Sequence, residues 1–431
     1  MSGKKPKLKV LVLAHSPENG GAGLALSGLI KTTVDTYDWT VVFTGKRPPD
    51  EPLKEGVSHW EAMDLPWWCY EAHDTPPTTN RPLIEKNLKR LKQLAAQADI
   101  LLTNTLTVPW LGFIAGEVHK PHLWYIHEFG DIDHKLKFHL GHAESLAVIS
   151  DTSSIVLAIS QAVKDYSSRA VDEKKIEIIH QSIDLNSLLA LPEKTTLEAP
   201  VRLLCAGAIK PSKGQEIALE AARLLGPSYA NLTVAGPNAH ANYAEKITKN
   251  VPKNATVSTG FADLFPLYER ADVVVMCSGN EALGRVTLEA MAAGRPAIGY
   301  DCPATRELLG DGRGVLYTPN TPEALAAAIK QTVSAAYFDT GPARQYASEL
   351  FSVKRQNSDF KNAVENAQRR GAPQYRPNFY QEYMNTLEAK GLLVSVTRSR
   401  LGNLKLVIAK CLPRPVKKVL KRARAAIAEL L

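Results

Sequence analysis

Short runs of apolar and β-branched residues alternate with longer segments of helical periodicity through most of the chain. The first half is predicted to contain strands at 10–14, 40–44, 100–103, 123–127, 155–159 and 176–179. After a polar stretch at 191–200 the same rhythm restarts, with strands predicted at 202–205, 232–235, 256–259, 273–277, 297–300 and 314–317. Strands that alternate with helices in this way predict β-α-β units and parallel sheets.

The restart of the pattern divides the chain into two units. We expect an α/β domain over 1–190, a second α/β domain over 200–370 and a tail over 371–431. Each unit has the alternation of an open, Rossmann-like sheet, and such sheets bind ligands at the carboxyl ends of their strands. The cleft between the two units is therefore the expected active site.

One segment interrupts the rhythm, because residues 45–82 are rich in proline and carry an aromatic cluster at Trp67, Trp68 and Tyr70. The segment is predicted to be a long surface excursion. Its aromatic side chains either pack within the loop or stay exposed, where they would stack on a sugar or contact a lipid.

Composition fits a globular protein with two cores, since 45% of the 431 residues are hydrophobic and 22% are charged. The five cysteines form no Cys-x-x-Cys pair, which favours neither a disulfide framework nor a zinc site and indicates a reducing compartment. The basic N-terminus precedes an apolar run too short for a signal peptide, and no run approaches the roughly 18 apolar residues of a membrane span. We therefore expect a cytoplasmic protein.

The net charge of +8 is concentrated at the C-terminus. Residues 371–431 contain 12 Lys and Arg against 3 Asp and Glu, so the first 370 residues are nearly neutral and a nucleic-acid partner is not expected. Within the tail, residues 404–431 have apolar and basic positions at helical spacing and predict a basic amphipathic helix. This helix either lies on an anionic membrane surface, making the protein peripheral to the membrane, or packs on the protein's own body.

The most informative stretch is DVVVMCSGNEALGRVTLEAMAAGRP at 272–296, which predicts a strand, a small-residue turn and a helix. The helix start can hold a diphosphate through its free backbone N–H groups and the positive end of its dipole. Glu281 lies in the turn and Glu289 inside the helix, so that one can meet a sugar and the other ribose hydroxyls. The predicted N–H donors are Gly284, Arg285, Val286 and Thr287.

Together these features resemble the Glu-x7-Glu signature of glycosyltransferase family 4. A second stretch, CAGAIKPSKGQ at 205–215, leaves a strand through Gly207 and places Lys210 and Lys213 where a phosphate can be neutralised. It is not a Walker loop. It is similar to the family's Gly-Arg-Leu-x3-Lys-Gly element, in which Lys213 matches the lysine, Ala208 replaces the arginine, and Lys210 is the expected substitute. Gly236 lies where the family holds the nucleotide base.

The first half carries two further elements of the resemblance. Gly20 and Gly21 in HSPENGGAG look like the family's Gly-Gly-Ala loop, which lies beside the acceptor and the donor phosphates. His127 in WYIHEFG matches the family histidine that meets the donor sugar. No metal-binding spacing accompanies His127, so neither a metal nor another cofactor is expected.

The resemblance implies a GT-B fold, with two Rossmann-like domains facing each other across a cleft. It implies a nucleotide-diphospho-sugar donor, a glycan or lipid-linked acceptor and retention of anomeric configuration, as in bacterial surface-polysaccharide and lipopolysaccharide transferases. Catalysis would rest on positioning, with Lys213 and the helix start stabilising the diphosphate while Glu281 and His127 orient the sugar. Two alternatives stay open: a nucleotide-sugar epimerase on the same fold, and a non-catalytic membrane-associated scaffold.

Overall fold

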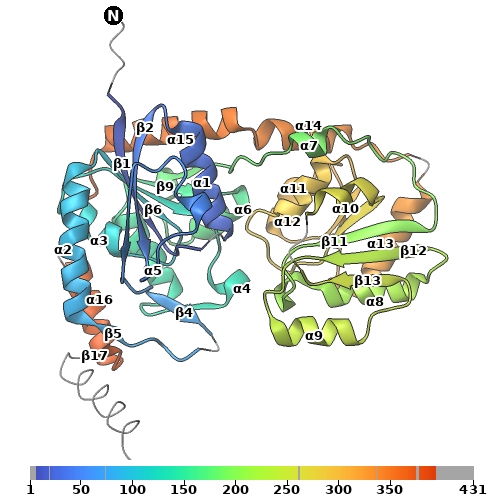
Figure 1. Cartoon of the computed structure of the whole chain (residues 1–431), viewed down its shortest axis with the longest axis horizontal. Helices are drawn as coiled ribbons and strands as arrows, with labels where there is room; N and C mark the ends of the chain where they lie inside the picture. The colour runs from blue at the N-terminus through green and yellow to red at the C-terminus, as the bar shows by residue number, and fades with distance from the viewer. Residues whose placement is uncertain are drawn as a thin grey trace, which may run out of the picture.

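A computed structural model describes residues 6–18, 20–72, 74–260, 263–335, 337–374 and 378–394 (Figure 1). The first half contains a seven-stranded parallel sheet in the order β10-β9-β7-β6-β1-β2-β3. Its apolar strands are buried on both faces, which explains their near-continuous hydrophobic sequences. The strands are β1 (Leu8–Ala14), β2 (Tyr37–Thr44), β3 (His59–Met63), β6 (Ile100–Asn104), β7 (His122–Ile126), β9 (Ile155–Ala158) and β10 (Ile176–Ile178).

The second half contains a six-stranded parallel sheet in the order β13-β12-β11-β14-β15-β16. Numbered within this half, the order is 3-2-1-4-5-6, the order of the doubly wound Rossmann fold. The predicted fold class, two Rossmann-like α/β units, is confirmed. The strands are β11 (Val201–Ala206), β12 (Ala230–Ala235), β13 (Ala255–Ser258), β14 (Val273–Met276), β15 (Ala297–Tyr300) and β16 (Val315–Tyr317).

Helices cover both sheets, and local signals set where several begin. Asn80 caps α2 by accepting the Leu83 N–H, and Thr321 caps α13 by accepting the Ala324 N–H. The helices of the first half are α1 (Gly21–Thr33), α2 (Arg81–Gln97), α3 (Trp110–Ala115), α4 (Asp131–His134), α5 (His142–Asp151), α6 (Gln161–Ser167) and α7 (Asn186–Leu189). Those of the second half are α8 (Gln215–Leu225), α9 (Ala241–Lys249), α10 (Phe265–Arg270), α11 (Arg285–Ala292), α12 (Pro303–Leu309), α13 (Pro322–Ser334) and α14 (Gly341–Leu350).

After α14 the chain returns to the first half through α15 (Val353–Arg370) and α16 (Asn378–Ala389) (Figure 1). Phe360 of α15 stacks on Trp39 at 5.8 Å between ring centroids, and Tyr383 of α16 packs edge-on against Trp110. The last described strand, β17 (Leu393–Val394), pairs with β5 (Thr79–Asn80). The described part of 371–431, expected as a tail, thus packs on the first half, whereas the predicted basic helix at 404–431 lies outside the described residues.

The prediction of a surface excursion at 45–82 was wrong for much of the segment. β3 extends the first sheet, and β4 (Cys69–Glu71) pairs antiparallel with β8 (Leu136–Phe138). Trp68 is fully buried, stacks on Trp124, and donates its indole N–H to the Leu106 carbonyl at 2.8 Å. The segment thus contributes the strands β3 and β4 and the core side chain of Trp68 despite its prolines.

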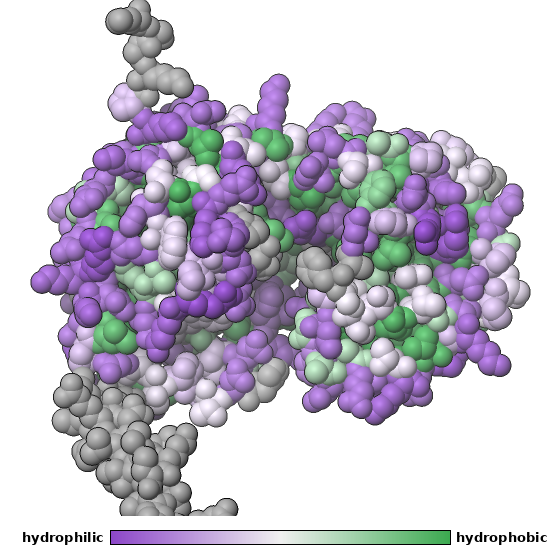
Figure 2. Space-filling view, viewed as in Figure 1, coloured by the Kyte–Doolittle hydropathy of each residue, from purple (hydrophilic) through white to green (hydrophobic). Residues whose placement is uncertain are grey.

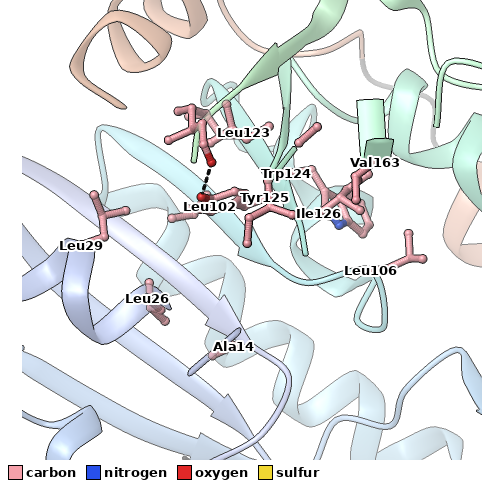
Figure 3. Close-up of a cluster of buried hydrophobic side chains, with 14 of the residues drawn as sticks. Ala14, Leu26, Leu29, Leu102, Leu106, Leu123, Trp124, Tyr125, Ile126 and Val163 are labelled. Atoms are coloured by element: carbon pink, nitrogen blue, oxygen red, sulfur yellow. Dashed lines mark hydrogen bonds between the residues drawn. The ribbon is translucent and has the colours of Figure 1, made fainter. Parts of the chain in front are cut away.

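The core of the first half forms around β7. Figure 3 shows Leu123, Trp124 and Ile126 among side chains from neighbouring elements, including Leu102 and Val163. Tyr125 donates its hydroxyl to the Ile179 carbonyl at 2.7 Å, which satisfies a fully buried polar group. This packing fixes the strand whose end carries His127.

Candidate active site

A cleft of about 510 Å³ lies between the two halves, at the carboxyl ends of their strands. Figure 2 shows the hollow between the halves, on a face that is largely hydrophilic. Residues that directly follow β1, β6 and β7 line one side, and residues that follow β11 and β14 line the other. Two parallel sheets facing each other in this way form the expected kind of ligand site.

The start of α11 points its free backbone groups into this cleft. Gly284, in the left-handed region at φ +82°, is its N-cap and provides no side-chain acceptor for the first N–H groups. Those groups carry the positive end of the helix dipole and suit an anion. All four predicted N–H residues line the cleft: Gly284, Arg285, Val286 and Thr287.

Lys213 and Glu281 form an ion pair across the two loops that follow β11 and β14. Gly214 allows the loops to approach closely, because a Cβ there would overlap the Cys277 carbonyl oxygen. Burial alone would raise the pKa of Glu281, but the charge and hydrogen bond of Lys213, with a bond from Ser278, hold that pKa below its usual value. The pair is therefore charged and partly exposed to the cleft.

Lys210 also lines the cleft, close to Lys213. Burial and the like charge of Lys213 lower the pKa of Lys210, while carboxylates from both halves oppose the shift. An incoming anion would relieve this repulsion, so the two lysines and the α11 start form one anion-binding region. The expectation that Lys210 serves in place of the arginine that Ala208 replaces stays a prediction.

Three of the predicted donor-site residues do not line the cleft: Gly207, Gly236 and Glu289. Gly207 has φ +128°, and a Cβ on Gly236 would overlap the Gly207 carbonyl, so these two glycines let β11 and β12 end side by side. Glu289 accepts the Tyr268 hydroxyl at 2.8 Å and lies 3.6 Å from Arg285. Burial raises the pKa of Glu289 although Tyr268 and Arg285 oppose the shift.

His127 faces the second half from the end of β7. Its Nε2 contacts the Asn104 side-chain oxygen at 2.8 Å, whereas its buried Nδ1 has no partner. Burial, with a smaller effect of nearby His15, lowers the pKa of His127 to about 3, so the ring is neutral at physiological pH. Gly20 and Gly21, at the start of α1, line the same part of the cleft.

The structure adds residues that the sequence patterns did not single out, namely His15, Glu71, Glu128, Asp133 and His134, and it places Trp67 of the aromatic cluster at the cleft. Glu128 accepts the Leu106 N–H at 2.8 Å, and burial raises the pKa of this carboxyl to about 7. Asp133 accepts the N–H groups of Phe129 and Gly130. His15 and Glu128 directly follow predicted strand residues, and this position at a strand end was the signal available for finding them.

The described ranges contain no group of three or more His, Cys, Asp or Glu residues arranged to hold a metal ion, and the expectation of no metal stays a prediction. Within the same ranges four cysteines are buried and free. None of the described helices is both long and apolar enough to span a bilayer.

Comparison with known proteins agrees with this geometry. A model of Glycosyltransferase Family 4 matches residues 20–187, and a model described as Glycosyl transferases group 1 matches residues 200–335. The chain therefore contains a Glycosyltransferase Family 4 domain in its first half and a Glycosyl transferases group 1 domain in its second, and it has the GT-B fold.

Similar proteins include further glycosyltransferases, and similar solved structures share the fold. The O-antigen chain mannosyltransferase RfbU of Salmonella typhimurium is 27% identical over 41% of this chain and 50% of its own length. The D-inositol 3-phosphate glycosyltransferase of Geodermatophilus obscurus is 32% identical over 37% and 38%. The chain thus spans at most about half the length of these relatives. Anabaena HepE, solved with UDP and glucose, has a TM-score of 0.67 at 19% identity, covering 83% of this chain and 99% of HepE, which shows a shared fold.

Proposed function

We propose that this chain transfers a sugar from a nucleotide-diphospho-sugar to a glycan or lipid-linked acceptor, with retention of anomeric configuration. The observation that carries the proposal is that Lys213, Lys210 and the start of α11 face His127 and the Gly20–Gly21 loop across one cleft. The names and titles of similar proteins support it, since HepE was solved with UDP and glucose and RfbU is named a mannosyltransferase.

In this mechanism the anion-binding region holds the diphosphate and stabilises the charge that develops on it as the sugar departs. Lys213 turns from Glu281 toward the phosphates, which frees the Glu281 carboxylate to accept hydroxyls of the donor sugar. The neutral His127 ring offers Nδ1 to the same sugar from the other half. Retention follows when the acceptor attacks from the face that the diphosphate leaves, so catalysis rests on positioning and electrostatics.

The setting that we propose is the synthesis of cell-surface polysaccharide on the inner face of the cell membrane. The basic segment at 404–431 would supply attraction to anionic lipids, at about 1 kcal/mol for each Lys or Arg near the surface. This attraction would hold the protein at the membrane that carries a lipid-linked acceptor.

The test is thermal stabilisation by UDP-, GDP-, dTDP- and ADP-sugars, because a ligand that binds only the folded state stabilises it by about 2.7 kcal/mol at 100 times its Kd. One nucleotide is expected to raise Tm. Lys213→Met is expected to lose most of that shift, each variant being compared with its own ligand-free Tm, while Lys249→Met, on the exposed side of α9, keeps it.

The two alternative functions, a scaffold and an epimerase, predict different outcomes. No shift with any nucleotide would contradict the proposal and favour the scaffold. Release of an epimerised nucleotide-sugar, seen by NMR of the incubated donor, would favour the epimerase. Transfer to a glycan with the donor's anomeric configuration, seen in the same spectra, is the expected result.

A further inference from the structure

The two sides of the cleft carry opposite charges. From the second half, Lys210, Lys213 and Arg285 line it, and Glu281 is already paired with Lys213. From the first half, the described lining residues include no Lys or Arg but three carboxylates, Glu71, Glu128 and Asp133. The basic side chains that the described part of the cleft offers to an anion therefore lie on one side only, whereas the first half offers the uncapped start of α1 at Gly20 and Gly21.

The histidines of the first half do not change this balance. Burial lowers the pKa of His15 to about 4 and of His127 to about 3, and burial also lowers the pKa of His134. All three rings are mainly neutral near pH 7. Because the Nδ1 atoms of His15 and His127 are buried without a partner, this side has hydrogen-bonding groups in excess of what the protein itself satisfies.

Trp67 gives the first-half side a flat, fixed apolar surface. Its indole N–H donates to the His15 carbonyl at 2.9 Å, and its ring lies 5.6 Å from the His15 ring. The side chain is only partly buried and lines the cleft. An aromatic face of this kind, beside carboxylate and imidazole groups, suits the C–H face and hydroxyls of a sugar ring.

Glu128 lines the same cleft, and its side chain has a fixed orientation. One carboxylate oxygen accepts the Leu106 N–H, which ties the side chain to the loop after β6. A carboxylate held in this way can accept a hydroxyl hydrogen, but it repels an anion through a medium of low effective dielectric.

Resting on the proposed function, we propose that the first-half side of the cleft selects an uncharged acceptor. The terminal sugar of that acceptor lies against Trp67 and donates a hydroxyl to Glu128, and acceptors phosphorylated on this sugar are excluded. A lipid-linked glycan satisfies this rule when its charge lies on the lipid side, away from the terminal sugar.

The experiment measures binding of octyl glycosides and of the matching sugar 6-phosphates to the full chain saturated with its nucleotide, by saturation-transfer NMR and calorimetry. Neutral glycosides are expected to bind at least tenfold more tightly than their phosphates. The discrimination should be full above pH 8 and shrink as pH falls through 7, because protonation of Glu128 removes one negative charge.

Variants separate charge selection from a structural role of the side chain. Glu128→Gln keeps an oxygen for the Leu106 N–H, so a purely structural role predicts unchanged selectivity. We expect this variant to bind the glycoside severalfold more weakly and the phosphate severalfold more tightly. Trp67→Phe should still bind the glycoside, but more weakly than the wild type. Glu144→Gln, on the exposed side of α5, is the matched control and should bind both ligands like the wild type.

Equal or tighter binding of the phosphates would overturn the inference, as would failure of every neutral glycoside to bind the nucleotide-saturated protein. In both cases nucleotide binding would still support the proposed function. Failure of every nucleotide to bind would overturn the proposed function and this inference with it.

Discussion

At the scale of single residues, Arg295 connects parts of the chain that are distant in sequence. Its side chain is 2% exposed and donates to the carbonyls of Tyr268, Glu269, Pro192 and Ala293 at 2.6–3.2 Å. The acceptors lie at the end of α10, in the linker between the halves and at the end of α11. Burial lowers the pKa of Arg295, and the carbonyls at the two helix ends compensate its charge.

Replacement of this guanidinium should therefore be costly even when the charge is kept. We expect Arg295→Lys to lower the free energy of unfolding by about 2–3 kcal/mol, because an ammonium cannot reach carbonyls in so many directions. Urea unfolding followed by circular dichroism measures the change. Arg202→Lys is the control, since Arg202 is 53% exposed and its pair with Asp272 should be worth less than about 1 kcal/mol. Equal effects of the two substitutions would contradict this account.

At the scale of elements, the first turn of helix α6 has acceptors from both halves, Ser160 as its N-cap and Glu307 of the second half. The N–H groups of Gln161 and Ala162 donate to the two carboxylate oxygens of Glu307 in α12, each at 3.1 Å. Ser160 accepts the Val163 N–H and donates to the Ala282 carbonyl beside the cleft. The N-terminal turn of α6 is therefore one of the places where the two halves are in direct contact.

Removal of Glu307 should loosen α6 without touching the donor site. We expect Glu307→Ala to cost about 1–2 kcal/mol locally, the usual cost of lost cap acceptors, and so to speed hydrogen exchange in the α6 peptide about tenfold. Glu323→Ala, in the exposed first turn of α13, is the control and should leave this peptide unchanged. Unchanged α6 exchange in Glu307→Ala would show that the cap does not stabilise the helix.

Some of these elements could be predicted from the sequence and others could not. Strands with apolar runs were visible, and the turn before α11 placed Gly284 and Glu281 together. β3 was missed because its five residues, HWEAM, lie at a sheet edge and have one buried position. The contacts of Glu289 with Tyr268, and the approach of Trp67 to His15, depend on residues brought together only by folding. No local pattern encodes such pairs.

At the scale of the whole molecule, the chain crosses between its halves twice. The linker near residue 192 leads into the second half, and α15 returns to cover the first, where Phe360 contacts Trp39 and Tyr37. All six tryptophans lie between residues 39 and 124. Tryptophan fluorescence therefore reports the first half alone, which allows its stability to be followed separately.

This probe can test how buried histidines set the pH dependence of the first half. Burial lowers the pKa of His15 and His122 to about 4 and of His127 to about 3, whereas an unfolded histidine titrates near 6.5. Between pH 6.5 and 4 the unfolded chain binds protons that the folded chain does not, so the free energy of unfolding rises with pH across this window. Glu128 has the opposite effect on the free energy of unfolding. The stability that it contributes is fully present below about pH 4.5 and is lost as pH rises through 7.

Burial also lowers the pKa of His139 to about 4, so at least four histidines oppose one carboxyl and we expect net stabilisation of the first half from pH 4.5 to 6.5. His122 bonds to Thr103 and to the Thr152 carbonyl and lies outside the cleft, so its replacement isolates one titration. His122→Asn should lower the slope of unfolding free energy against pH by up to about 1.4 kcal/mol per pH unit, whatever its effect on stability at a single pH. His119→Asn, an exposed residue at φ +54° where asparagine is tolerated, should keep the wild-type slope. An unchanged slope in His122→Asn would show that this histidine is not held neutral by its burial.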